Sequence, residues 1–424
     1  MTQATFEDGA RETPVAAQPS ENSSISKETR GSAPVGGPSA PAGHFPWAAL
    51  LVMALMGFLL IATETMPAGL LPQIATGLHV TEGTAGQFVS AYALGTVIAA
   101  MPAVALTRGL RRKPVFLVGI LGFLATSLFT AFSTDIVVSL GARLLAGAFS
   151  GLLWGMTAGY ARRITAPHQA GRALSVASVG TPVGLAVGTP FGSWLGTTFD
   201  WRWSFGVLAI LAAVTLLLAA FLVPDAPGQR AGTRVPLARV FAIPGVAVVL
   251  GVIVSWMLGH NMMYTYIGSY LRGASRDDLP VGVALVVFGA AAIAGIVITG
   301  ALIDKGLRRL ILLSLGSFML AGVIFIVGQG SLVAVLAAIV LWGIAFGGAA
   351  AQLQTAISVA SGENADVANS MLGVAFNLAI FAAGVAGAVV ITSFGGMFLP
   401  AALAGLAAVA LVTAVAGRRT AFPT

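Results

Sequence analysis

Glu64 and Arg143 are the two ionisable side chains that lie well inside long apolar stretches of the sequence. Such groups are costly to bury and usually face a cavity or one another. Glu64 is either a proton carrier or a hydrogen-bonded carboxyl that stiffens its helix next to Pro67. Arg143 either holds Glu64 ionised until the two separate or forms a permanent structural ion pair with it. Both lie about seven to nine positions from the same helix end, so their depths agree within about 3 Å. We expect them to approach each other, directly or through water, in at least one state.

The other reactive residue types form no catalytic or metal-binding pattern. The 424 residues include no cysteine, which excludes disulfides, thiolate nucleophiles and Cys-based metal sites. None of the three lysines follows the glycine of a phosphate-binding loop, which argues against an ATP-driven pump. The four histidines are scattered, without the spacing of a metal site. We therefore expect no enzyme, no cofactor and no metal.

The elements that must position these residues are membrane-spanning helices. With 57% hydrophobic residues, 9% charged residues and a mean hydropathy of +0.92, the chain has too little polar surface for a water-soluble domain. A span needs about 20 mostly apolar residues. The sequence predicts twelve spans, which start near Pro46, Thr84, Pro114, Ile136, Ala173, Trp203, Ile243, Val281, Leu310, Leu332, Asn369 and Met397.

The net charge of +7 is a topology signal, not a sign of nucleic-acid binding. With the N-terminus in the cytoplasm, eighteen of the 22 basic residues lie in cytoplasmic tails and loops. The opposite side holds three, which are Arg202, Arg272 and Arg276. Cytoplasmic loops of membrane proteins carry such an excess of Lys and Arg, so we expect both termini in the cytoplasm and an even number of spans.

The chain is expected to consist of two similar halves. Thr107–Arg112 reads TRGLRR and Asp304–Arg309 reads DKGLRR, 197 positions later. A basic hairpin that recurs at half the chain length is typical of transporters built from repeated bundles. We expect an all-α membrane protein with twelve transmembrane helices in two pseudo-symmetric six-helix bundles. The predicted domains are a disordered tail (1–44), an N-terminal bundle (45–223), a linker (224–240), a C-terminal bundle (241–417) and a short tail (418–424).

Several motifs resemble the major facilitator superfamily, over residues 46–417. Its signature Gly-x-Leu-Ala-Asp-Arg-x-Gly-Arg-Arg is similar to the hairpin between spans two and three, where Thr107 replaces the acid. Span four carries Arg143-x-x-Ala-Gly147, similar to an element of proton-coupled members. Ala62–Ala75 and Asp200–Arg202 resemble the drug and sugar efflux branch, which includes arabinose-efflux and chloramphenicol-resistance permeases. Span five resembles the Gly/Pro-rich element typical of drug–proton antiporters at Gly184, Gly188, Pro190 and Gly192, with Pro190 shifted by one position.

The resemblance implies a central cavity bordered by spans one, four, seven and ten. Its expected substrate contacts are Trp154, His260, Asn261, Tyr264, Tyr266 and Asn377, with Trp342 as a further candidate. Ordinary helix packing is the alternative for these side chains, and a proton relay is a second role for His260. Tyr264 and Tyr266 are about 200° apart on a helix, so both cannot face the cavity.

The resemblance also implies a gate on the cytoplasmic side. The expected gate residues are Arg108, Arg111, Arg112, Asp304, Arg308, Arg309, Glu363 and Asp366. In the superfamily the first basic hairpin lies against the start of span eleven. Because the loop before that span is acidic, we expect a first-half arginine to pair with Glu363 or Asp366 when the cytoplasmic side is closed.

The function we expect is export of a small, amphipathic molecule of the drug or sugar class by proton antiport with alternating access. The protein would be a monomer in the bacterial inner membrane, with substrate, protons and lipid as its partners. Two alternatives stay open. One is a proton-coupled uptake symporter of the same fold, and the other is a transport-dead membrane sensor or partner protein.

Overall fold

Apolar helices make up the first half of the chain, separated by short turns that proline, glycine and polar caps define. The computed structural model describes residues 45–107, 109–228, 237–276 and 278–422. The Asp135 side chain accepts a hydrogen bond from the Val138 N–H at 2.9 Å and so caps the N-terminus of its helix. The elements of the first half are α1 (Trp47–Thr65), η1 (Met66–Gly69), α2 (Leu71–Gly77), α3 (Glu82–Thr107), α4 (Arg112–Phe132), α5 (Ile136–Arg163), η2 (Pro167–Gln169), α6 (Ala170–Ser178), α7 (Gly180–Val183), the π-helical η3 (Gly184–Gly188), α8 (Thr189–Thr198) and α9 (Trp201–Leu222).

The second half repeats this pattern of long helices and short turns. Its elements are α10 (Leu237–Phe241), α11 (Pro244–Thr265), α12 (Ile267–Gly273), α13 (Val281–Val327), α14 (Leu332–Gly347), α15 (Ala349–Ser361), η4 (Gly362–Asn364), α16 (Ala365–Ser393), η5 (Gly396–Phe398), α17 (Leu399–Ala416) and η6 (Gly417–Arg419). Gly43–Thr424 forms one compact unit, and its described residues contain helices and no strands. The expected all-α fold is confirmed.

Ten stretches of the described residues are long and apolar enough to cross a membrane. One of them, α13, has 47 residues, about 70 Å of helix, whereas the hydrocarbon core is about 30 Å thick. Its backbone is non-helical at Gly306, so α13 is two helices joined by a kink. Dividing α13 there and adding the 26-residue α3 gives twelve apolar helices within the described residues, consistent with the expected number.

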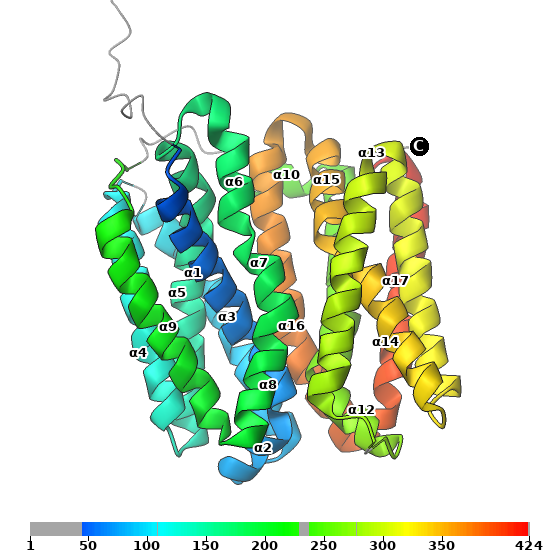
Figure 1. Cartoon of the computed structure of the whole chain (residues 1–424). Coiled ribbons are helices and arrows are strands. Elements are labelled where there is room, and N and C mark those ends of the chain that lie inside the picture. Colours follow the sequence, from blue (N-terminus) through cyan, green and yellow to red (C-terminus); the bar gives the residue numbers. More distant parts are fainter. Residues whose placement is uncertain (1–44, 108, 229–236, 277, 423–424) are drawn as a thin grey trace, which may run out of the picture. The chain divides into compact units, whose positions relative to one another are not determined.

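The helices pack mainly within their own half. In the first half α1 packs on the α6–α8 segment and on α9, α3 packs on α5, and α4 packs on α5 and α9. In the second half α13 packs on α14 and α17, and α11 packs on α16 and α17. The short helices α2 and α12 lie at one end of this unit, which we call the α2/α12 end. The opposite end, which we call the α6/α10 end, holds α6, α10 and the end of α17 (Figure 1).

The predicted domain boundaries can be placed on these elements. The N-terminal bundle was predicted to end at Val223, which follows directly on α9, and the C-terminal bundle to begin three residues before α11. The predicted tail 1–44 lies outside the described residues. Ala421 and Phe422, which we assigned to the C-terminal tail, are buried.

Candidate functional site

Arg143 is buried in α5 and is held by backbone carbonyls of two other helices. Its Nε donates to the Phe88 carbonyl oxygen of α3 at 3.0 Å, and its Nη2 donates to the Thr63 carbonyl oxygen of α1 at 2.9 Å. The guanidinium carbon lies 4.7 Å from the centroid of the Tyr92 ring. A buried charge is tolerated only with such partners. Arg143 therefore ties together three helices of the first half.

Glu64 follows Thr63 in α1, and its side chain is half-buried. Its charge and that of Arg143 are close enough to interact electrostatically. The two side chains nevertheless form none of the ion pairs in the described residues, because the arginine donates to the carbonyls instead. The direct approach that we expect in at least one state stays a prediction.

Tyr92 of α3 is the member of this cluster that the sequence did not reveal. It is fully buried, its ring covers the Arg143 guanidinium, and its hydroxyl donates to the Leu60 carbonyl oxygen at 3.1 Å. Tyrosine is common in apolar helices, and the residues around it give no sign of which neighbour it faces. We call Glu64, Tyr92 and Arg143 the buried polar cluster.

Glycine allows α5 to approach α3 closely next to this cluster. A Cβ atom at Gly147 would lie 1.9 Å from the Tyr92 carbonyl oxygen, and one at Gly95 would lie 1.9 Å from the Leu144 carbonyl oxygen. Neither distance is possible for a real side chain. The pairing of Arg143 with Gly147 thus combines a charge with the close packing that buries it.

The glycines of the span-five element form a row that packs on α1. Built Cβ atoms at Gly180 and Gly184 would lie 1.7 Å from the Ala54 carbonyl oxygen and 2.8 Å from the Phe58 carbonyl oxygen. Gly188 and Gly192 continue the row against Ala62 and Met66. Pro190 stands in the first turn of α8. These residues set the position of the helix that carries Glu64, and a further antiport-specific role stays a prediction.

His260 lies in an aromatic cluster of the second half. Its ring stacks on Phe346 with centroids 3.4 Å apart and planes 8° apart. The Trp342 Nε1–H donates to His260 Nδ1 at 3.1 Å, so a neutral His260 carries its proton on Nε2. Tyr264 and Phe288 complete the cluster. The structure thus provides the neighbouring helix that satisfies the histidine.

The remaining candidate cavity residues lie in different surroundings. Tyr266 is fully buried between α11 and α16, where its hydroxyl donates to the Gly384 carbonyl oxygen at 2.7 Å. Asn261 is half-buried and donates to the Met257 carbonyl oxygen at 2.9 Å. Asn377 has a buried Oδ1 without a hydrogen-bond partner, and Trp154 is half-buried. Among these, Asn377 and Asn261 keep polar capacity for a ligand.

Comparison with known proteins identifies the family. Residues 53–384 match the model of the Major Facilitator Superfamily. The chain belongs to the Major Facilitator Superfamily. It is similar to a "Probable sugar efflux transporter" of Haemophilus influenzae (strain PittGG), with 26% identity over 350 residues, 82% of this chain and 88% of that protein. A protein of the same description from Helicobacter pylori (strain G27) is 25% identical over 347 residues, 82% of this chain and 89% of that protein.

Superfamily membership makes this chain a multi-pass membrane transporter, and transporters of this family expose a site by moving two halves. The hydrogen bonds and the ion pair described here between the halves lie toward the α2/α12 end. The Gln87 Nε2 donates to the Gly384 carbonyl oxygen at 3.2 Å, and the Ser90 hydroxyl donates to the Phe381 carbonyl oxygen at 3.2 Å. Nearer the turn, Glu82 of α3 pairs with Arg272 of α12. In this structure the α2/α12 end is therefore closed.

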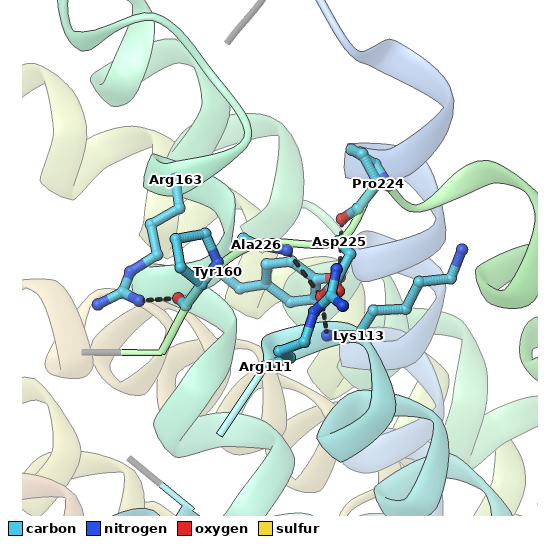
Figure 2. Close-up of polar contacts among 8 residues, drawn as sticks. Arg111, Lys113, Tyr160, Arg163, Pro224, Asp225 and Ala226 are labelled. Carbon is cyan, nitrogen blue, oxygen red and sulfur yellow. Dashed lines mark hydrogen bonds and ion pairs between the residues drawn. The ribbon is translucent and has the colours of Figure 1, made fainter. Parts of the chain in front are cut away.

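At the α6/α10 end, Asp225 gathers the expected gate residue Arg111 and the start of the linker (Figure 2). The Arg111 Nε lies 2.5 Å from Asp225 Oδ2, and the Lys113 N–H donates to Oδ1 at 3.1 Å. The Tyr160 hydroxyl donates to the Pro224 carbonyl oxygen at 2.9 Å. We call this group the linker clasp. All its members belong to the first half and the linker start.

The linker clasp lowers the pKa of the Asp225 carboxyl. Desolvation raises this pKa, but the N–H groups of Lys113 and Ala226 and the charge of Arg111 outweigh it. Sequence reasoning missed Asp225. Asp225 lies between Pro224 and Pro227, just after an apolar stretch, and it is an acidic residue in an otherwise basic linker. This pattern could have indicated it as a partner for the basic hairpin.

The other expected gate residues are placed as follows. Asp304 and Arg309 are exposed on either side of the kink at Gly306, and Arg308 is half-buried with its Nε lacking a partner. Glu363 is exposed in η4, and Arg112 is buried. Arg108 and the side chain of Asp366 lie outside the described residues. The pairing with Glu363 or Asp366 concerns a state in which that end is closed, and it stays a prediction.

Proposed function

We propose that this transporter exports a small, amphipathic molecule of the sugar or drug class in exchange for protons, with Glu64 as the proton carrier and Arg143 as its partner. The observation that carries this proposal is the buried polar cluster. Arg143 is satisfied by two carbonyls, so the half-buried Glu64 carboxyl next to it is left without an ion-pair partner. A carboxyl in that position can take up and release a proton as the halves move.

The similarity to proteins described as sugar efflux transporters supports export as the direction and sugars as one substrate class. The candidate cavity residues Asn261 and Asn377 offer amide groups. His260, Tyr264 and Trp342 are buried in this structure and would offer aromatic surface only after the halves move. Aromatic and amide groups together suit a molecule with one apolar and one polar face.

We propose that transport proceeds by alternating access. The domain division at the linker would let the two halves rock, and the closed α2/α12 end would open as the α6/α10 end closes. The proton gradient supplies the energy, since one elementary charge that crosses 100 mV contributes about 2.3 kcal/mol. We place the transporter in the bacterial inner membrane as a monomer, with both termini and the α6/α10 end on the cytoplasmic side.

The test compares wild-type protein with Glu64→Gln in bacterial cells and in everted membrane vesicles. Labelled arabinose and chloramphenicol serve as probes. For a proton-driven exporter, an uncoupler raises accumulation in cells that carry the wild-type protein, and Glu64→Gln abolishes accumulation in energised vesicles. The variant still exchanges labelled for unlabelled probe across the membrane, because exchange needs no net proton movement.

Three results would contradict this function. An uptake symporter accumulates the probe in cells and loses that accumulation with the uncoupler. A transport-dead protein changes neither probe under any condition. Normal export by Glu64→Gln against a gradient removes Glu64 from the proton path.

A further inference from the structure

The carbonyl of Thr63 lacks the donor that a regular helix would give it. In an α-helix each carbonyl accepts from the N–H four residues later. For Thr63 that residue is Pro67, which has no N–H. The α1 helix ends at Thr65, and η1 begins at the residue before Pro67. The Thr63 carbonyl oxygen is the one to which the Arg143 Nη2 donates at 2.9 Å.

This bond fixes where the guanidinium lies relative to Glu64. A guanidinium has five N–H donors and no acceptor, so its orientation follows the acceptors around it. One acceptor is on α1 and the other, the Phe88 carbonyl, is on α3. The Tyr92 ring covers the group. The charge is held next to Glu64 while its donors are engaged by carbonyls.

We propose that Pro67 is a positioning residue of the proton-coupling site. By removing its own N–H, Pro67 frees the Thr63 carbonyl to hold Arg143 beside Glu64 without a direct ion pair. An alanine at position 67 restores the competing N–H, which weakens the hold on Arg143. The released guanidinium then pairs with the Glu64 carboxylate, and a carboxylate paired with an arginine takes up a proton less readily. This inference rests on the proposed role of Glu64.

Pro72 provides a matched control. It stands in the first turn of α2, where a backbone N–H has no acceptor within the helix. Pro72→Ala thus restores an N–H in the same segment without a competing arginine.

The hydrogen bond itself is tested by a double-mutant cycle on purified protein, with no substrate present. Arg143→Lys keeps the charge but replaces the two separate donor nitrogens, Nε and Nη2, by one ammonium group. We expect Arg143→Lys to lower the melting temperature by the same amount in the wild-type protein and in the Pro72→Ala variant. In the Pro67→Ala background the drop is less than half as large, because the Thr63 carbonyl is already satisfied. Equal drops in all three backgrounds overturn the inference. If the Pro67→Ala protein is not expressed in the membrane, Pro67→Ser takes its place, because it restores the same N–H.

The positioning role is tested by transport of labelled arabinose. We expect Pro67→Ala to keep exchange within about twofold of wild type and to lose at least about fivefold of proton-driven accumulation, the scale of one hydrogen bond. Pro72→Ala retains both. If the wild type is coupled, Glu64→Gln is uncoupled and Pro67→Ala stays coupled, the positioning role is wrong and the proposed function stands. If Glu64→Gln stays coupled, the proposed function itself is wrong.

Discussion

The two ends of the transporter each contain an arginine–carboxylate pair, but the pairs join different parts of the chain. At the α2/α12 end, Arg272 and the Ser269 hydroxyl of the second half meet Glu82 of the first half. In the linker clasp, Arg111 meets Asp225, and both lie on the first-half side of the linker. The first pair must break whenever the halves separate at that end. The second can persist through such a movement, because both of its members lie on the first-half side.

The largest effect is expected from a bulky side chain in the closed contact. A Cβ atom at Gly86 would lie 2.1 Å from the Tyr266 hydroxyl oxygen, and Tyr266 is fully buried. Overpacking costs about 1–3 kcal/mol, so Gly86→Val should keep the α2/α12 end from closing and lower transport by about tenfold or more. Because the chain has no cysteine, a single Ser90→Cys in the buried contact can report opening by maleimide labelling.

The control for Gly86→Val is Gly141→Val on α5, where a Cβ atom meets nothing within 4 Å. That variant should label and transport like the parent. If Gly86→Val leaves Ser90→Cys as protected as before, the contact is not the closed gate that the comparison of the two ends requires.

A smaller effect is expected from Glu82→Arg, which places two like charges across the closed end. Partly exposed pairs contribute about 0–1 kcal/mol, and 1 kcal/mol is about a fivefold change in a two-state equilibrium. Labelling of Ser90→Cys should rise by roughly that factor. The double exchange Glu82→Arg with Arg272→Glu should restore protection.

Asp278→Arg is the matched control, since Asp278 faces Arg276 at 3.5 Å within one loop of the second half. It introduces the same repulsion without involving the other half. Equal labelling changes in Glu82→Arg and Asp278→Arg would mean that net charge, and not the pair between the halves, governs opening.

The smallest effect concerns the linker clasp and depends on pH. Because the pKa of Asp225 is lowered in the folded protein, its contribution to stability is complete above the unfolded value of about 3.9 and is lost as pH falls through the folded value. Asp225→Asn should therefore melt slightly below wild type at neutral pH, and the difference should vanish in strong acid. Labelling of Ser90→Cys should not change. If the difference in melting temperature between wild type and Asp225→Asn grows as the pH falls, the Asp225 carboxylate does not stabilise the linker clasp.

Much of the fold could be predicted from the sequence because span boundaries are local. Apolar runs are interrupted by prolines, glycines and capping acids, so the expected start of span five at Ala173 lies three residues from Ala170, where α6 begins. Span twelve was expected near Met397, and α17 begins at Leu399. The cost of burying a charge singled out Glu64 and Arg143 by the same local reasoning.

The contacts of the site could not be predicted in the same way. The acceptors of Arg143 are backbone carbonyls 55 and 80 residues away, and a carbonyl is present at every position. Tyr92 and Glu82 owe their partners to how α3 lies against α5 and α12, which no single stretch encodes. Asp225 was assigned to a linker because of its prolines, although those prolines present it to Arg111.

The helical turn from Gln87 to Ser90 takes part in two sets of contacts at once. Gln87 and Ser90 bond to α16 of the other half, while the Phe88 carbonyl between them accepts from Arg143. Only a displacement of this turn relative to α5 would change the length of the Arg143 bond. One turn of α3 therefore connects the contact between the halves directly to the arginine that lies near Glu64.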